Sequence, residues 1–197
     1  MDRRQAIQRG FAGVASLTLS PELARGALRA SAPATLARGD RAYLDVAVRA
    51  SRWLERTAQR RGDTFVWSAD PDRPAEVGYD LYNGTTGVLP FWVELYSATN
   101  EPRAFEFVHG SAEHLLQSLR TVNPRDAGLY TGLAGIGFAL GLAHRVTRDD
   151  AHREGALRAL ALVREAAVGA DGAAGASPVR WMDSTDIISG SAGTGLY

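Results

Sequence analysis

The stretch Leu129-Tyr130-Thr131-Gly132-Leu133-Ala134-Gly135-Ile136 has two counterparts in this chain of 197 residues, at 80–87 and 186–193. All three place two glycines three residues apart, at the point where a loop gives way to an apolar segment. The pairs are Gly84 and Gly87, Gly132 and Gly135, and Gly190 and Gly193. One such pair is weak evidence, but three pairs in one frame, each separated by enough residues for a helical hairpin and a loop, indicate a repeat architecture.

The segments after the first two glycine pairs are apolar nearly all round, which predicts helices that are buried on every side. In the first turn of such a helix, a glycine pair removes two side chains from one face, so that another backbone can approach. The segments between the repeats differ, because their apolar residues recur about every 3.6 residues and indicate helices half exposed to water. The three apolar stripes are Tyr43, Ala47, Ala50, Trp53 and Leu54; Phe105, Val108, Ala112, Leu115, Leu116 and Leu119; and Leu157, Leu160, Val163 and Ala167.

The alternation of amphipathic and apolar helices predicts an all-α fold. We interpret it as a partial α/α toroid, a double ring of helical hairpins in which the glycine-bearing helices form the inner layer. The expected helices lie at 41–60, 85–98, 102–121, 133–146 and 150–168, with a short last helix from about 190.

The strings at 129–136 and 186–193 resemble the inner-helix starts of lanthionine synthetase C-like (LanC-like) proteins. The resemblance covers roughly residues 40–197 and corresponds to the N-terminal part of such a domain. It implies a toroid in which two cysteines and a histidine of the later repeats hold a zinc ion. In the cyclase members this zinc activates a peptide cysteine thiolate, which adds to a dehydroalanine or dehydrobutyrine and closes a thioether ring.

The chain departs from the family in its metal ligands. It contains no cysteine, and thiolates are the soft ligands that the family's zinc site requires. Its histidines show no paired metal-binding spacing; they are His109, His114, His144 and His152. We therefore expect no metal and no cofactor in this chain, because the zinc of the family is held through residues that are absent here.

The chain stops shortly after its third glycine pair, so we expect it to be a fragment of a longer, truncated toroid domain. In a ring of hairpins each repeat covers only its neighbours, and an open end exposes apolar faces. The alternative is a self-sufficient half-ring that self-associates through its open edge.

Asp186 is the best candidate for chemistry. It stands four residues before Gly190, and the resemblance implies an acid/base role for an aspartate at this position. A carboxylate near a helix N-terminus is stabilised as the anion, which favours a base or a hydrogen-bond acceptor. The alternative is plain capping of the loop. Asp80 has the same offset from Gly84, and this duplication favours a structural role for both residues.

Other side chains are expected near Asp186, at the end of the ring where the inner helices begin. Those expected to line the cavity are Asp80, Tyr82, Tyr130 and Asp183. The loop 61–79 carries Trp67, Asp70, Asp72 and Arg73, and two interpretations of it remain open. The loop either lies over the cavity and contacts a substrate, or is a surface loop with tight proline turns.

Three functions remain open: a thioether-forming peptide cyclase, a non-catalytic toroid that binds a peptide or a glycan, and an α/α-toroid glycosidase. The glycosidase needs a pair of carboxylates across the cavity, and Asp80 and Asp186 are the candidates. A peptide is the expected partner. Basic and acidic residues are equal in number, 22 each, so no overall basic field favours nucleic acid. No apolar run is long enough for a transmembrane helix.

The segment Asp2-Arg3-Arg4-Gln5-Ala6-Ile7 resembles the start of a twin-arginine export signal. A weakly apolar stretch and a segment rich in small residues follow it, which is the layout of a secretory signal. We expect residues 1–35 to be signal peptide and leader, and the protein to be exported to the periplasm or the extracellular space. The alternative is a cytoplasmic protein with a disordered leader or a short N-terminal helix.

Replacement of both Arg3 and Arg4 by lysine is expected to hold the protein in the cytoplasm, because the paired arginines are the feature that this export route reads. Fractionation of cells that express the wild type or the double variant measures the effect. Export that is unchanged by the double substitution would exclude the twin-arginine route.

Overall fold

The computed structural model describes residues 38–70, 72–169 and 179–197, all within one structural unit, Arg38–Tyr197. The expected signal and leader, residues 1–35, lie outside the described residues. In chain order the elements are α3 (Arg38–Thr57), β1 (Gln59–Arg61), β2 (Thr64–Val66), α4 (Thr85–Thr99), α5 (Pro102–Ser118), α6 (Leu133–Thr147), α7 (Asp150–Glu165), β3 (Val168–Gly169), β4 (Val179–Arg180) and α8 (Ser191–Thr194). Every expected helix is present, and its ends differ from the expected ones by three residues at most.

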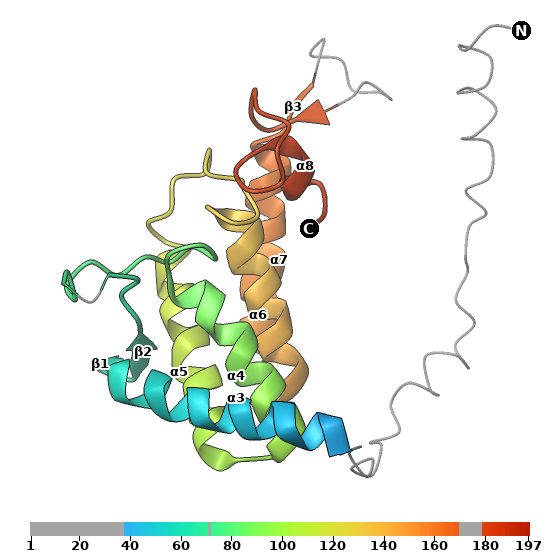
Figure 1. Cartoon of the computed structure of the whole chain (residues 1–197). Helices are drawn as coiled ribbons and strands as arrows, with labels where there is room; N and C mark the ends of the chain where they lie inside the picture. Colours follow the sequence, from blue (N-terminus) through green and yellow to red (C-terminus); the bar gives the residue numbers. More distant parts are fainter. Residues whose placement is uncertain (1–37, 71, 170–178) are drawn as a thin grey trace, which may run out of the picture. The chain divides into compact units, whose positions relative to one another are not determined.

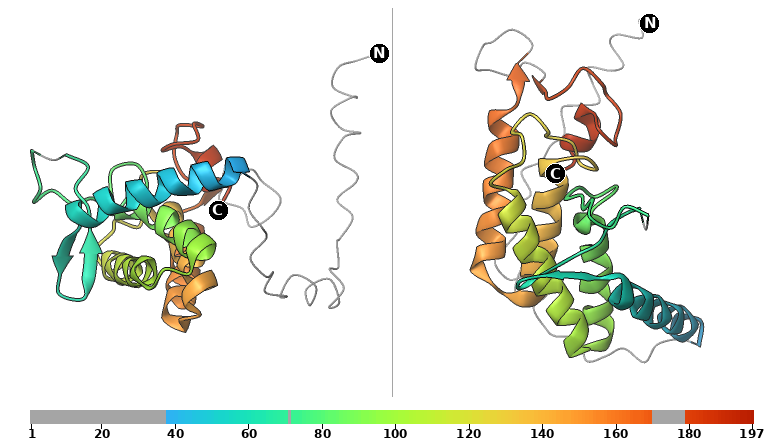
Figure 2. Two further views of the ribbon diagram at one scale, coloured as in Figure 1. Left: turned by 60° about the horizontal axis from the view of Figure 1, so that its bottom comes forward. Right: turned by 90° about the vertical axis from the view of Figure 1, so that its left-hand side faces the viewer.

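The helices form two layers, as the sequence predicted (Figure 1). The glycine-bearing helices α4 and α6 lie side by side as the inner layer, and α5 and α7 pack against them as the outer layer (Figure 2). Helix α8 is the start of a third inner helix, and α3 runs across α4. The all-α, partial α/α toroid is therefore confirmed. In the part of the chain that the structure describes, no helix combines the length and the apolar character needed to cross a membrane.

An aromatic cluster forms the core between α4 and α5. The rings of Trp92 and Phe107 stack with their centroids 4.4 Å apart, and Trp67 lies 5.7 Å from Phe107. Trp67 is only 4 % exposed, and its indole N–H donates to the carbonyl of Leu54 at the end of α3. Trp67 is thus a packing residue that ties the loop to the core.

The two glycines of each repeat make room for the loop that leads into the same helix. The amide of the first helical residue donates to the carbonyl seven residues earlier in all three repeats: Thr85 to Gly78 (3.1 Å), Leu133 to Asp126 (2.7 Å) and Ser191 to Ser184 (2.9 Å). A Cβ at the second glycine, Gly87, Gly135 or Gly193, would lie 2.3, 2.1 or 1.9 Å from the carbonyl oxygen of Leu81, Leu129 or Ile187. The expected close approach of another backbone is therefore present, and that backbone belongs to the loop.

The structure corrects three details of the apolar stripes. On α3, Ala47 and Leu54 of the expected stripe do pack on the core, together with Leu44 and Val48, whereas Tyr43 and Trp53 are 79 % and 56 % exposed. Leu157 is exposed on α7. On α6, Phe138 is exposed although the helix was expected to be buried all round.

Two short antiparallel strand pairs were not expected from the sequence. Strands β1 and β2 pair Gln59 with Val66, and β3 and β4 pair Val168 with Arg180. The first hairpin turns at Gly62, whose φ of +63° is a conformation that favours glycine at the start of a two-residue turn. This hairpin places β2 and Trp67 against α5.

Replacement of Gly135 by alanine is expected to lower the free energy of unfolding by about 1–3 kcal/mol, because the new methyl group collides with the carbonyl oxygen of Leu129. Gly141 in the same helix is the matched control, since a Cβ there meets no atom within 4 Å. Gly141→Ala is expected to raise the free energy of unfolding by about 0.5–1 kcal/mol, because glycine is entropically costly inside a helix. Denaturant titrations of both variants measure this, and equal effects would contradict the glycine argument.

Candidate functional site

The three glycine loops come together at the end of the molecule where the inner helices begin. We call residues 78–87, 126–135 and 184–193 the loop edge. Main-chain hydrogen bonds join its repeats: the amide of Tyr82 donates to the carbonyl of Tyr130, and the amide of Tyr130 donates to the carbonyl of Ile188, both at 3.0 Å. These three residues occupy the same position, two residues before the first glycine of each pair. The repeat that fixes the helix starts therefore also aligns the residues of the candidate site.

Asp186 caps its own loop. Its Oδ1 accepts hydrogen bonds from the amides of Ile188 (2.7 Å) and Ser189 (2.8 Å), and its Oδ2 accepts from the hydroxyls of Ser184 and Ser189. The hydrogen bond from Ser184, followed by that from the Ser189 amide, lowers the pKa of Asp186 to about 2. The carboxylate is therefore an anion at every physiological pH, and a group with so low a pKa is a weak general base.

Asp80 makes the same contacts in the first repeat. Its Oδ1 accepts from the amides of Tyr82 (2.9 Å) and Asn83 (2.6 Å). The equivalent position of the middle repeat is Gly128, so this loop lacks the carboxylate. The structure thus shows the capping geometry that the sequence offered as the alternative for both aspartates, while a role of Asp186 in chemistry stays a prediction.

The other expected residues differ in exposure. Tyr82 is 65 % exposed at the loop edge, and Tyr130 is half-buried. Asp183 is exposed beside the loop edge and forms an ion pair with Arg180. Sequence reasoning missed Ile187 and Ile188, which are large, apolar and exposed next to Asp186. The signal was present, because Ile188 stands at the repeat position of Tyr82 and Tyr130.

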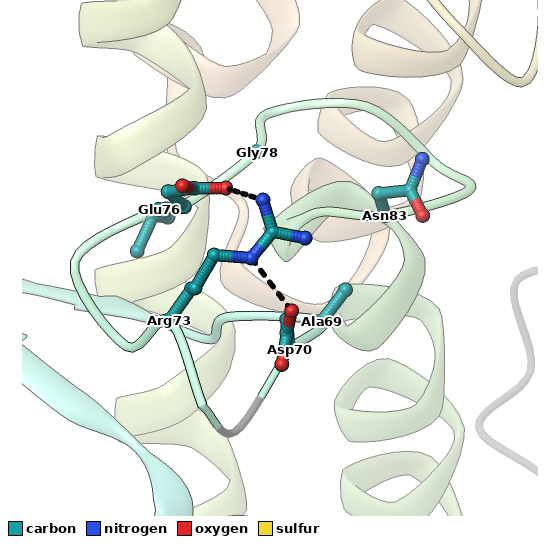
Figure 3. A pocket seen from close by; sticks show the side chains of 7 residues that line it. Ala69, Asp70, Arg73, Glu76, Gly78 and Asn83 are labelled. Carbon is teal, nitrogen blue, oxygen red and sulfur yellow. Dashed lines mark hydrogen bonds and ion pairs between the residues drawn. The ribbon is translucent and has the colours of Figure 1, made fainter.

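The loop 61–79 borders the first repeat of the loop edge. Figure 3 shows Arg73 between two carboxylates: its guanidinium contacts Asp70 at 2.8 Å and Glu76 at 3.0 Å. These side chains, with Gly78 and Asn83, line an open hollow of about 680 Å³. The amide of Asp72 donates to Asp70 and holds the turn below Arg73. Of the four loop residues singled out in the sequence, Asp70 and Arg73 line this hollow.

Comparison with known families agrees with this architecture. The family model described as "Lanthionine synthetase C-like protein" matches residues 75–197, which is more than half of the chain. The chain belongs to the lanthionine synthetase C-like family. The matched residues contain all three glycine pairs of this LanC-like protein and begin just before its first glycine loop. Searches of curated proteins and of solved structures gave no match.

The residues of this LanC-like chain do not fit the zinc site that the resemblance implies. The chain has no cysteine, and its loop edge contains no histidine. The polar side chains there are carboxylates, hydroxyls and the amide of Asn83, and the carboxylates of Asp80 and Asp186 accept hydrogen bonds from their own loops. His109 lies in the middle of α5 and His152 in the first turn of α7, and neither belongs to the loop edge. No reaction step through the family's zinc follows from the residues present.

Stability should depend on the charge of Asp186 in a defined pH range. Its pKa of about 2 lies below its ordinary value of 3.8, so its contribution to stability is present above about pH 4 and is lost as the pH falls toward 2. We expect Asp186→Asn to lower the melting temperature at pH 7, and this deficit to shrink between pH 4 and pH 2. Asp183→Asn is the control, because its side chain caps no loop. A deficit that stays constant down to pH 2 would contradict the assignment.

Proposed function

We propose that this LanC-like protein binds an extended peptide along its loop edge. The observation that carries the proposal is a row of exposed apolar side chains held by main-chain hydrogen bonds between repeats. Tyr82 and Ile188 occupy the same repeat position at the two ends of this row, and Ile187 stands beside Ile188. Exposed apolar groups that are fixed in a row and flanked by polar groups are typical of interaction surfaces.

The charges of the loop edge indicate the kind of peptide. Asp186 is a permanent anion beside Ile187 and Ile188, and Asp80 supplies a second carboxylate next to Tyr82. Complementary charge favours a basic side chain or a free amino group in the bound segment. The proposed ligand is therefore a peptide with apolar side chains and at least one positive charge.

Binding fits the loop edge better than chemistry does. Glycoside hydrolysis needs a carboxylic acid with a raised pKa as proton donor, and the hydrogen bonds of Asp186 lower its pKa instead. The thioether-forming reaction of the family uses zinc held by residues of later repeats, and the loop edge itself contains no cysteine or histidine. Exposed apolar side chains and two carboxylates remain, and such groups can recognise a peptide without reacting with it.

The binding proposal can be tested with a random twelve-residue peptide library displayed on phage. We expect enrichment of apolar peptides that contain lysine or arginine. Tyr82→Ala and Ile188→Ala should each weaken the selected peptides about tenfold, which is the effect of losing one well-packed interface contact. Tyr43→Ala is the matched control, because Tyr43 is also exposed but lies on α3, away from the loop edge.

Two outcomes would contradict this function. The first is a selection without enrichment, or enriched peptides that bind the Tyr82 and Ile188 variants as tightly as the wild type. The second is catalysis, which is tested with a synthetic peptide that carries one cysteine and one dehydroalanine. We expect this peptide to lose its free thiol no faster with the protein than without it. Alkylation of the remaining thiols and mass spectrometry measure this loss. Faster loss with the protein would show that the chain forms thioethers.

A further inference from the structure

Four metal-ligating side chains meet between the outer helices α5 and α7. His109 and Glu113 stand one turn apart on α5, and Asp149 and His152 stand at the start of α7. One ligand atom from each lies within 4.8 Å of the others. The Nε2 of His152 is 3.6 Å from Oε1 of Glu113, and the Nε2 of His109 is 3.7 Å from Oδ2 of Asp149. We call these four residues the α5–α7 cluster.

The hydrogen bonds of His152 fix which ring nitrogen carries the proton. Its Nδ1 lies 2.8 Å from Oγ1 of Thr147, and the hydroxyl of Thr147 donates to the carbonyl of Ala143 at 3.0 Å. Because the only proton of this hydroxyl is used, its oxygen must accept the proton of His152 Nδ1. The Nε2 of His152 therefore carries a lone pair that points into the cluster.

This lone pair lacks a partner. The side chain of His152 is fully buried, and among the described residues its Nε2 has no hydrogen-bond partner. The carboxylate of Glu113, at 3.6 Å, is beyond hydrogen-bond distance. A buried polar atom without a partner is costly, so the arrangement calls for a group that binds the lone pair.

We propose that the α5–α7 cluster binds a zinc ion. Two imidazoles and two carboxylates are ligands that zinc accepts, and four protein ligands make a closed, structural site. Tetrahedral zinc with ligand distances of about 2.0–2.1 Å sets its donor atoms about 3.4 Å apart, close to the two separations seen here. Thr147 orients His152 as the outer partners of metal-bound histidines do. The two carboxylates balance the charge of the ion.

The contacts of Asp149 leave one of its oxygens for the metal. Its Oδ1 accepts from the amide of Ala151 and caps α7, while Oδ2 faces His109. The side chains of His109 and Asp149 are 46 % and 38 % exposed, so an ion can enter from solvent. This site differs in ligands and in place from the zinc that the resemblance implies. The proposal departs from our expectation that the chain holds no metal. The proposed zinc would link the successive outer helices α5 and α7.

The test uses the full chain, stripped of metal with a chelator and then titrated with zinc alone. Elemental analysis after gel filtration should find one zinc per chain. The melting temperature should rise by about 5–10 °C when free zinc reaches a hundredfold excess over its dissociation constant. Glu113→Gln and Asp149→Asn should each weaken zinc binding at least tenfold. The second variant separates metal binding from folding, because the asparagine side chain keeps an oxygen that caps α7.

Glu106→Gln on α5 is the matched control, because Glu106 is exposed and pairs with Arg103 outside the cluster. It should bind zinc as the wild type does. Cobalt(II) in place of zinc should give the intense visible absorption of a four-coordinate ion, and this absorption should be lost in Asp149→Asn. Substoichiometric zinc in the wild type, unchanged affinity in both cluster variants, or the weak spectrum of six-coordinate cobalt would each overturn the proposal.

Discussion

The contact between loop carbonyls and the first turns of the inner helices is the constraint on which the rest of the structure depends. Only glycine leaves room for these carbonyls, as the 1.9–2.3 Å approaches to Gly87, Gly135 and Gly193 show. The contact presses each loop against its own helix, so all three loops end at the same level. That alignment brings the amide of Tyr82 to the carbonyl of Tyr130 and makes one continuous edge from separate repeats.

The sequence predicted this fold well because the glycine pairs and the spacing of the apolar residues both identify the inner helices and the starts of these helices. It predicted less well which face of a helix is buried. On α3, two neighbouring faces carry apolar residues at helical spacing, one with Tyr43 and the other with Leu44 and Val48. Which of these faces is buried depends on α4 and Trp67, which pack against only one of them.

The candidate site was predictable in position and not in chemistry. The common offset from a glycine places Asp80 and Asp186 in equivalent loops, but the pKa of Asp186 is set by Ser184 and by the amides of Ile188 and Ser189, which the glycine motif does not specify. The α5–α7 cluster was missed for a different reason. Two of the ligands, His109 and Glu113, lie four residues apart on α5, and the other two lie three residues apart at the start of α7. The two pairs meet only when α5 packs against α7.

Successive repeats are held together by different means at the loop edge and in the outer layer. At the loop edge, main-chain hydrogen bonds between Tyr82, Tyr130 and Ile188 join the repeats and leave side chains free to face a ligand. In the outer layer, side chains from the middle of α5 and from the start of α7 face each other, where the proposed zinc joins them. A hairpin in a repeat protein contacts only its neighbours, and here successive repeats also pack helix against helix, α4 against α6 and α5 against α6. This packing and the hydrogen bonds of the loop edge fix the spacing of its exposed side chains, as recognition of an extended peptide requires.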